Sequence, residues 1–453
     1  MPLLSRCRFK GQLLILLATV LLSAVLPASS SFAQDSGSSP AAEKPAAKAA
    51  ERDWDFRWDN RPSLRYGDLL RIDVRARLVT DMRRPDAAFV DNDTSRFDIA
   101  RRRIGVEGEI GDVADFQIER DFADRRRWRD VYVNYRGIDR LELQAGQFKL
   151  PFGLDENTSS TNLDFVYRSR AARLSPGRDP GLMAHGRVGV LRYEAGAFTQ
   201  DGDNGRASGL PRPSSGWTTA GRLLVQPLRS TTSVFEDFQA GVAYTSSDVQ
   251  SGIADLRGPS ALRDPFFRPE FAVQGMRRRV GLEMRWRPGP FSVQSELVRM
   301  ASERLGQSVE DLDLPSLTAS AWYVHGTWVV TGEKKASGAD EPKRPLFDGG
   351  FGSLEFAARV EGVRFSSAGL EPPFDLAQGR PTTGPRAETI LPHRDSAITL
   401  GVNWSPNRWI RVQGNLIRDT ISIPTGGAPL SGALVDGPSS SFWSRVVRFR
   451  FAL

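Results

Sequence analysis

The sequence predicts an all-β fold, a transmembrane β-barrel of 16 antiparallel strands. Apolar and charged residues alternate with period two from Tyr66 to the end of the chain, in runs of about 10 residues separated by Gly, Pro, Asp and Asn. The runs are even in number, as single-chain bacterial barrels require. An export signal precedes them, and no later apolar stretch approaches the length of a transmembrane helix.

The amino terminus has the features of a secretory signal peptide. Three basic residues within the first ten precede the apolar stretch Leu13–Leu26, and a Ser-x-Ala pattern ends at Ala33. The alternative, a membrane-anchoring helix, needs roughly 20 apolar residues. We therefore predict a signal peptide over residues 1–33 and export to the cell outer membrane. Cys7 is the only cysteine, so the mature chain has no disulfide.

Two segments are expected after the signal peptide. Residues 34–62 begin with a stretch rich in Ala, Ser, Pro and Lys and predict a flexible lead-in. Residues 63–453 predict the barrel domain.

The first three runs show the alternation most clearly. Their apolar faces comprise Leu70, Ile72, Val74, Ala76 and Leu78; then Ala100, Ile104, Val106 and Ile110; then Phe116, Ile118 and Phe122. Their charged or polar faces comprise Arg71, Asp73, Arg75 and Arg77; then Arg101, Arg103, Glu107 and Glu109; then Asp115, Gln117, Glu119 and Asp121. Soluble sandwiches rarely sustain such a dense charge row. A barrel in lipid needs it on the water-filled inside.

The remaining runs complete the count of sixteen. We expect strands at about 128–136, 140–149, 181–188, 190–199, 217–228, 237–247, 275–287, 290–301, 316–331, 351–365, 395–405, 408–420 and 441–453. Short connections alternate with long polar ones, as expected for periplasmic turns and outer loops. The connection 332–350 breaks this rule because it should be short, so a strand there could be misplaced.

The two ends of the strands carry further membrane signals. Seven tryptophans lie near run ends, as in the aromatic girdles of membrane barrels: Trp128, Trp217, Trp286, Trp328, Trp404, Trp409 and Trp443. The last run alternates to the final residue and ends on an apolar side chain, Leu453. This ending resembles the recognition signal for outer-membrane assembly.

A family resemblance is carried by the stretch from Arg101 to Arg187. It contains RRRIGVEGEIGDVADFQIERDFAD and DVYVNY, then GQFKLPFGLDENTSS (Gly146–Ser160) and SPGRDPGLMAHG (Ser175–Gly186). This stretch resembles the phosphate-selective porin O and P family. The last two segments are its most specific elements, and the other strands match in pattern only.

The resemblance implies a 16-stranded barrel, usually a homotrimer, whose long third loop folds into the lumen and narrows it. By position this loop is Leu150–Pro180, and it supplies Arg168, Arg170, Arg173 and Arg178, while Lys149 matches a basic position of the family. The implied function is an outer-membrane channel for small anions, among them phosphate or polyphosphate.

Arginine chemistry agrees with that function. Guanidinium groups stay ionised and match oxyanions, and a selective pore needs fixed charge spread over successive sites. We expect Arg71, Arg75, Arg77, Arg101 and Arg103 to face the lumen, joined by Arg277, Arg279, Arg285 and Arg287. One alternative is that these residues pair across strands and stiffen the wall. Another is that arginine is abundant only through codon preference. A third is a closed pore with a structural or receptor role.

Other chemistry is not expected. The three histidines, His185, His325 and His393, share no metal spacing, and no cofactor motif is present. Glu and Asp in GLDENTS could bind calcium, but a polar loop start is the simpler reading. An outer-membrane hydrolase built on His325 remains an alternative to the non-enzymatic reading. Export separates the chain from nucleic acid, so its partners are small anions and outer-membrane lipid.

Overall fold

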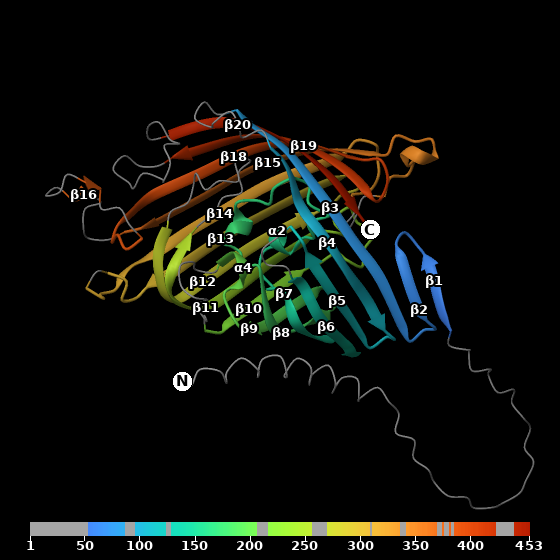
Figure 1. Cartoon of the computed structure of the whole chain (residues 1–453), viewed down its shortest axis with the longest axis horizontal. Coiled ribbons are helices and arrows are strands. Elements are labelled where there is room, and N and C mark those ends of the chain that lie inside the picture. Colours follow the sequence, from blue (N-terminus) through green and yellow to red (C-terminus); the bar gives the residue numbers. More distant parts are fainter. Residues whose placement is uncertain are drawn as a thin grey trace, which may run out of the picture. The chain divides into compact units, whose positions relative to one another are not determined.

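The computed structural model describes residues 53–86, 96–123, 128–205, 216–255, 270–308, 310–335, 341–368, 374–375, 380–381, 385–422 and 439–453. Eighteen strands form one antiparallel sheet. Sixteen of them close into a barrel, because the last strand, β20, pairs with β3 (Figure 1). The predicted fold class is confirmed.

The barrel strands follow one another in chain order around the ring. They are β3 (Leu70–Asp86), β4 (Arg96–Ile110), β5 (Ala114–Asp121), β6 (Trp128–Ile138), β7 (Leu141–Lys149), β8 (Arg178–Val188), β9 (Leu191–Phe198), β10 (Thr218–Val225), β11 (Gln239–Asp255), β12 (Glu270–Trp286), β13 (Phe291–Arg304), β14 (Leu314–Val329), β15 (Ser353–Ser367), β18 (Ile390–Ser405), β19 (Ile410–Ser422) and β20 (Ser439–Ala452).

The remaining elements are short. They are the hairpin β1 (Trp54–Trp58) and β2 (Pro62–Tyr66), the pair β16 (Phe374–Asp375) and β17 (Arg380–Pro381), and the helical turns α2 (Leu154–Asn157), α3 (Ala171–Leu174), α4 (Gly202–Gly205) and η2 (Leu346–Asp348). Within the described residues, no helix has the length and apolar character needed to cross a bilayer.

The distribution of side chains is the reverse of that in a water-soluble protein. On β18, the apolar Ile398 and Leu400 are 50% and 52% exposed, whereas Thr399 between them is 1% exposed and Asp395 on the same strand is 2% exposed. Strand β15 repeats this pattern, with exposed Val360 between buried Arg359 and Glu361. Since successive residues of a strand point to opposite faces, the outside of the barrel is apolar and the inside is charged. Such a surface fits lipid outside and water inside.

This arrangement makes Leu400 a sensitive reporter of the membrane. An arginine on the lipid-facing side of a barrel costs about 2–4 kcal/mol at the bilayer midplane and about 0–1 kcal/mol near the interface. We expect Leu400→Arg to lower the free energy of unfolding in lipid vesicles by about 2–4 kcal/mol in a denaturant titration. Ser396→Arg, on the same exposed face but nearer the end of β18, is the control and should change it by under about 1 kcal/mol. Equal effects of the two substitutions would contradict the orientation.

Aromatic side chains gather where the short turns lie. Phe235 stacks on Trp286 with ring centroids 4.8 Å apart, and Phe291 stacks on Trp328 at 6.1 Å. At the opposite strand ends, Trp128, Trp217 and Trp443 are 51%, 69% and 40% exposed. Two aromatic belts at the two strand ends agree with the interfaces of a bilayer.

The hairpin β1–β2 differs from the prediction of a flexible lead-in over residues 34–62, because residues 54–58 form a strand. Strand β2 pairs with the first residues of β3, from Leu70 to Asp73. The pairing of β3 with β20 begins only at Arg77, so the two partners of β3 follow one another along the same edge. The indole Nε1 of Trp409 donates a 2.7 Å hydrogen bond to the carbonyl of Asn60 in the hairpin turn. The hairpin therefore lengthens the barrel wall at its seam.

The long connection between β14 and β15 does not hide a misplaced strand. The two strands pair directly, from Thr318 opposite Ser366 to Val329 opposite Glu355, without a register shift. The described part of the connection contains only the single turn η2.

Candidate functional site

A cavity of about 900 Å³ lies on the charged inner face of the barrel. Its basic lining residues are Arg75, Arg77, Arg101, Arg103, Arg129, Lys149, Arg168, Arg173, Arg178, Arg192, Arg222, Arg285, Arg287, Lys335 and Arg448. Its acidic lining residues are Asp81, Glu119, Asp130, Glu156, Asp164 and Glu194. The lining therefore carries fifteen basic side chains against six carboxylates, and the cavity is polar and positive.

Eight of the ten residues predicted to bind anions line this cavity, and Arg71 and Arg170 do not. Arg71 is paired with Asp73 at 2.8 Å. Among the other arginines expected on the inner face, Arg285 and Arg287 line the cavity. Arg277 and Arg279 instead bind Asp201, at 2.6 and 2.5 Å.

A β-bulge in β4 lies next to Arg101 and turns Ala100 toward the cavity. Val79 pairs with Arg101 and Thr80 pairs with Ile99, so Ala100 is left without a partner in β3. The extra residue changes the phase of the alternation, and both Ile99 and Ile104 are exposed, at 40% and 60%. The prediction that Ala100 faces lipid was wrong, because Ala100 lines the cavity.

Arg101 lies among other arginines. The charged side chains that act on it most strongly are four other arginines, Arg77, Arg103, Arg168 and Arg448. Within the described part of the chain, its buried Nη1 has no hydrogen-bond partner. Unpaired, convergent guanidinium groups are the arrangement that an oxyanion binds.

The neighbours of Arg101 are partly neutralised. Arg103 binds Asp121 at 2.7 Å and Glu119 at 3.1 Å. Arg448 forms a bidentate pair with Asp81, with distances of 2.6 and 2.7 Å. The alternative that arginines pair across the wall thus holds for these residues, and it does not hold for Arg101.

Arg75 and Arg77 are held by different partners. The guanidinium of Arg75 pairs with Glu107 and lies 3.2 Å from the side-chain oxygen of Gln117. Arg77 donates a 2.7 Å hydrogen bond to the hydroxyl of Ser160 and lies 3.8 Å from Glu119. Arg77 therefore links the wall to the segment between β7 and β8.

That segment, residues 150–177, contacts strands far from its own. The backbone N–H groups of Leu154 and Asp155 donate to the carboxylate of Glu296 on β13, both at 3.2 Å. The N–H of Val166 donates to Asn415 on β19 at 2.8 Å, and its carbonyl accepts from Arg448 on β20 at 2.6 Å. The segment is fastened to inward-facing side chains on the other side of the ring.

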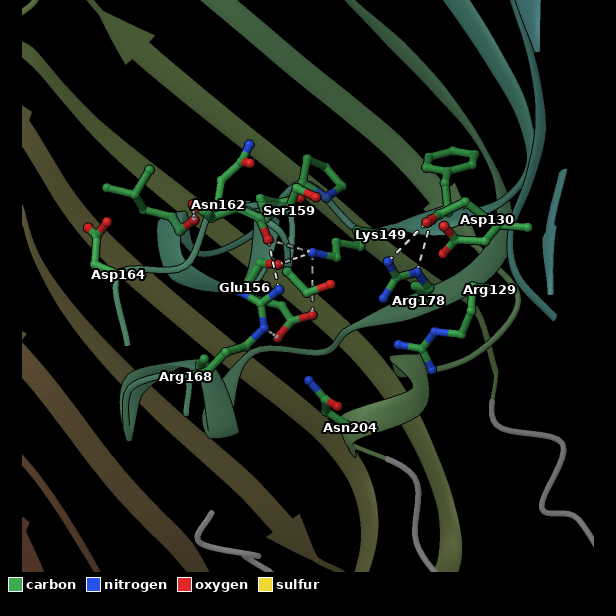
Figure 2. Close-up of a pocket in the computed structure, with 18 of the residues that line it drawn as sticks. Arg129, Asp130, Lys149, Glu156, Ser159, Asn162, Asp164, Arg168, Arg178 and Asn204 are labelled. Atoms are coloured by element: carbon green, nitrogen blue, oxygen red, sulfur yellow. Dashed lines mark hydrogen bonds and ion pairs between the residues drawn. The ribbon is translucent and has the colours of Figure 1, made fainter. Parts of the chain in front are cut away.

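Lys149, just before the segment, and Arg168, within it, both contact Glu156 (Figure 2). The ammonium of Lys149 donates to the carbonyls of Glu156 and Thr158 and lies 3.9 Å from the Glu156 carboxylate. Arg168 lies 3.5 Å from the same carboxylate. Burial raises the pKa of Glu156, but Arg168 and Lys149 outweigh burial and hold it below its usual value. This carboxylate stays ionised at neutral pH.

Arg170 anchors the segment to the wall. Its guanidinium pairs with Asp395 on β18 at 2.7 Å and with Asp419 on β19, and its backbone N–H donates to Glu361 on β15 at 2.6 Å. All four residues are at most 2% exposed. Burial lowers the pKa of Arg170, but the two aspartates outweigh burial and hold it above its usual value.

Two further predicted residues, Arg178 and Arg173, line the cavity. Arg178 forms a bidentate pair with Asp130, with distances of 2.9 and 3.0 Å (Figure 2). Arg173 lies on α3, and burial together with Arg170 and Arg168 outweighs Glu156 and lowers its pKa to about 10. Arg173 remains a cation at neutral pH.

Lys335 is a cavity residue that sequence reasoning missed. It comes from the connection between β14 and β15, and its ammonium binds Asp164 at 2.5 Å and also pairs with Glu355. His325 lies 3.3 Å from the same aspartate. Burial raises the pKa of Asp164, but Lys335 and His325 outweigh burial and hold it well below its usual value. No group of three or more metal-ligating side chains occurs in the described residues.

A comparison with protein families settles the classification. The sequence model of the phosphate-selective porins O and P matches residues 72–421, which is most of the chain. The chain belongs to this family. The resemblance that the sequence showed between Arg101 and Arg187 is confirmed, and membership of a porin family supports an outer-membrane channel rather than an enzyme.

Solved structures similar to this porin agree on the fold. OmpT of Vibrio cholerae has 12% sequence identity and a TM-score of 0.53, and the alignment covers 86% of this chain and 99% of OmpT. The outer-membrane channel DcaP of Acinetobacter baumannii has 11% identity and a TM-score of 0.50, with coverage of 86% and 99%. No curated protein has a significantly similar sequence. At these identities the solved structures show the barrel fold alone.

Proposed function

We propose that this porin forms a water-filled channel in the outer membrane through which small anions diffuse, phosphate and polyphosphate among them. The observation that carries the proposal is the excess of fifteen basic over six acidic side chains around one cavity. Four further arginines act on Arg101, whose buried Nη1 has no hydrogen-bond partner among the described residues. Fixed positive charge on successive strands replaces part of an anion's hydration without trapping it at a single site.

The segment 150–177 supplies the narrowest part of the channel in this proposal. Its polar contacts reach β13, β15, β18, β19 and β20, and a loop on the outer surface could not make them all. A segment lying inside the lumen explains them together. The expected third loop, Leu150–Pro180, then ends three residues into β8, which begins at Arg178.

Export and assembly complete the proposal. Residues 1–33 serve as a signal peptide, and three copies form a homotrimer. One of the solved structures with the same fold is a trimer form of Vibrio cholerae OmpT, with 11% identity and a TM-score of 0.50. The mass of the purified barrel in detergent tests the trimer independently of conduction.

Single-channel recording of the full chain in planar lipid bilayers tests the conduction. With a potassium chloride gradient, we expect the reversal potential to have the sign for anions, and inorganic phosphate should reduce the chloride current by competing for the same arginines. Cation preference would refute the charge argument. A silent bilayer would favour the alternative of a closed barrel with a structural or receptor role.

A further inference from the structure

An arginine row crosses the outer face of the barrel, away from the cavity. Arg299 on β13 pairs with Ser320 on β14, Ser320 pairs with Arg364 on β15, and Arg364 pairs with Arg394 on β18. Paired residues of neighbouring strands share one face of the sheet. All three arginines are exposed, on the same face as the apolar Val360 and Ile398.

The arginine row consists of Arg299, Arg364 and Arg394. None of the three forms an ion pair with a carboxylate in the part of the chain that the structure describes. Arg364 and Arg394 stand directly opposite each other, where like charges destabilise a sheet. A bound external anion would offset this repulsion.

The height of the row identifies the surroundings. Arg299 lies about 8 residues, and Arg364 and Arg394 about 11 residues, from the turn ends of their strands. At about 3.4 Å per residue and a tilt near 40°, these spacings place the row roughly 20–28 Å above the periplasmic rim, close to the height of a barrel's apolar band of about 25 Å. The row therefore lies at the headgroups of the outer leaflet.

We propose that the arginine row binds phosphate groups of phosphorylated lipid headgroups in the outer leaflet. Guanidinium groups bind phosphate with paired, directional hydrogen bonds, and basic clusters beside the membrane bind anionic headgroups. Neighbouring strands are about 4.8 Å apart, so the side chains of Arg364 and Arg394 can reach one phosphate while Arg299 reaches another. Apolar side chains below the row cover the acyl chains of the same lipid.

A second feature of the outer face is consistent with this site. Arg418 on β19 is also exposed, and its guanidinium lies 5.8 Å from the ring centre of Trp443. An arginine held over an interfacial tryptophan presents its remaining donors toward the headgroups.

The test uses the full chain in detergent and the triple variant Arg299→Gln, Arg364→Gln, Arg394→Gln. Binding of diphosphorylated lipid A is measured by native mass spectrometry, with the dephosphorylated lipid as a second probe. We expect the triple variant to lose about a hundredfold in affinity for the phosphorylated lipid, the loss expected for three basic residues at an anionic lipid surface. Affinity for the dephosphorylated lipid should not change.

The matched control removes the same charge elsewhere, with Arg57→Gln, Arg140→Gln and Arg229→Gln, all exposed and at the turn end of the barrel. It should bind phosphorylated lipid like the wild type. Equal loss in the two triple variants would overturn the proposal, as would equal loss for the dephosphorylated lipid. Displacement of the lipid by inorganic phosphate would overturn the assignment to a lipid.

The lipid site depends on the outer-membrane location and not on the anion selectivity of the lumen. Because the row faces away from the cavity, the triple variant should keep the reversal potential of the wild type in planar bilayers. A shift in that potential would show that these arginines act on the permeating ion and would contradict their assignment to the outer face. The lipid-binding measurement and the reversal potential therefore test the lipid site and the anion channel separately.

Discussion

Replacing Arg170 by glutamine should lower the free energy of unfolding by about 3–5 kcal/mol and increase the single-channel conductance. The substitution leaves Asp395 and Asp419 buried without their cation, and removing one partner of a buried ion pair costs about this much. It also removes the two ion pairs through which Arg170 holds the segment 150–177 to β18 and β19. Denaturant unfolding in lipid vesicles and bilayer recording measure the two effects.

A second substitution separates the anchor from general damage to the barrel. In the double variant Arg170→Gln, Asp419→Asn, one of the stranded carboxylates is neutral, so part of the lost stability should return. The ion pairs of Arg170 are still missing, so the conductance should stay high. Arg278→Gln, at an exposed arginine of the outer face, is the charge-matched control and should change neither quantity. If conductance returned to normal with stability in the double variant, Arg170 would have no role in positioning the segment.

The barrel itself could be predicted from the sequence because the signal for it, the alternation of apolar and charged residues, lies within each single strand. Alternation is a period of two along one strand, and it appears in any window of 10 residues, as in the run from Leu70 to Leu78. The contrast between lipid and water makes that period strong, since Leu400 and Asp395 must face different solvents. Strand ends were placed within a few residues for most strands for the same reason.

Features that depend on pairing between strands could not be predicted in this way. The bulge at Ala100 has no local signature, because the extra residue is defined only by its missing partner in β3. The strand over residues 54–58 contains three aromatic residues and only five positions, too few for a reliable period.

The same distinction between local patterns and long-range pairing applies to the residues of the candidate site. Alternation identified the inward arginines of β3 and β4, and the resemblance identified Lys149, Arg168, Arg173 and Arg178. Neither could show that Arg170 is an anchor, because its partner Asp419 is 249 positions away. Lys335 was missed because it lies in a connection rather than in a strand. Ion pairs between residues far apart in the sequence decide which arginines have a carboxylate partner. The composition of the chain does not reveal these pairs.

Among the inward-facing arginines, we expect Arg101 to have the largest effect on anion transport, because the described residues show no carboxylate bound to it. Opposite unit charges 4 Å apart attract by about 1 kcal/mol in water and by about 4 kcal/mol at an effective dielectric constant near 20. A change of about 1.4 kcal/mol is tenfold in an equilibrium constant. We therefore expect Arg101→Gln to lower the anion-to-cation permeability ratio by about tenfold, and Arg101→Glu to lower it further.

The adjacent residue provides the matched control for this prediction. Arg102 has the same charge, lies on the same strand and is exposed on the outer face, where its guanidinium donates a 2.9 Å hydrogen bond to the carbonyl of Phe122. Arg102→Gln should leave the permeability ratio unchanged. Measured from reversal potentials in a salt gradient, equal ratios for the two variants would mean that the net charge of the protein, and not the unpaired guanidinium inside it, sets the preference. A loss confined to Arg101 would assign the selectivity to the inward-facing guanidinium on β4.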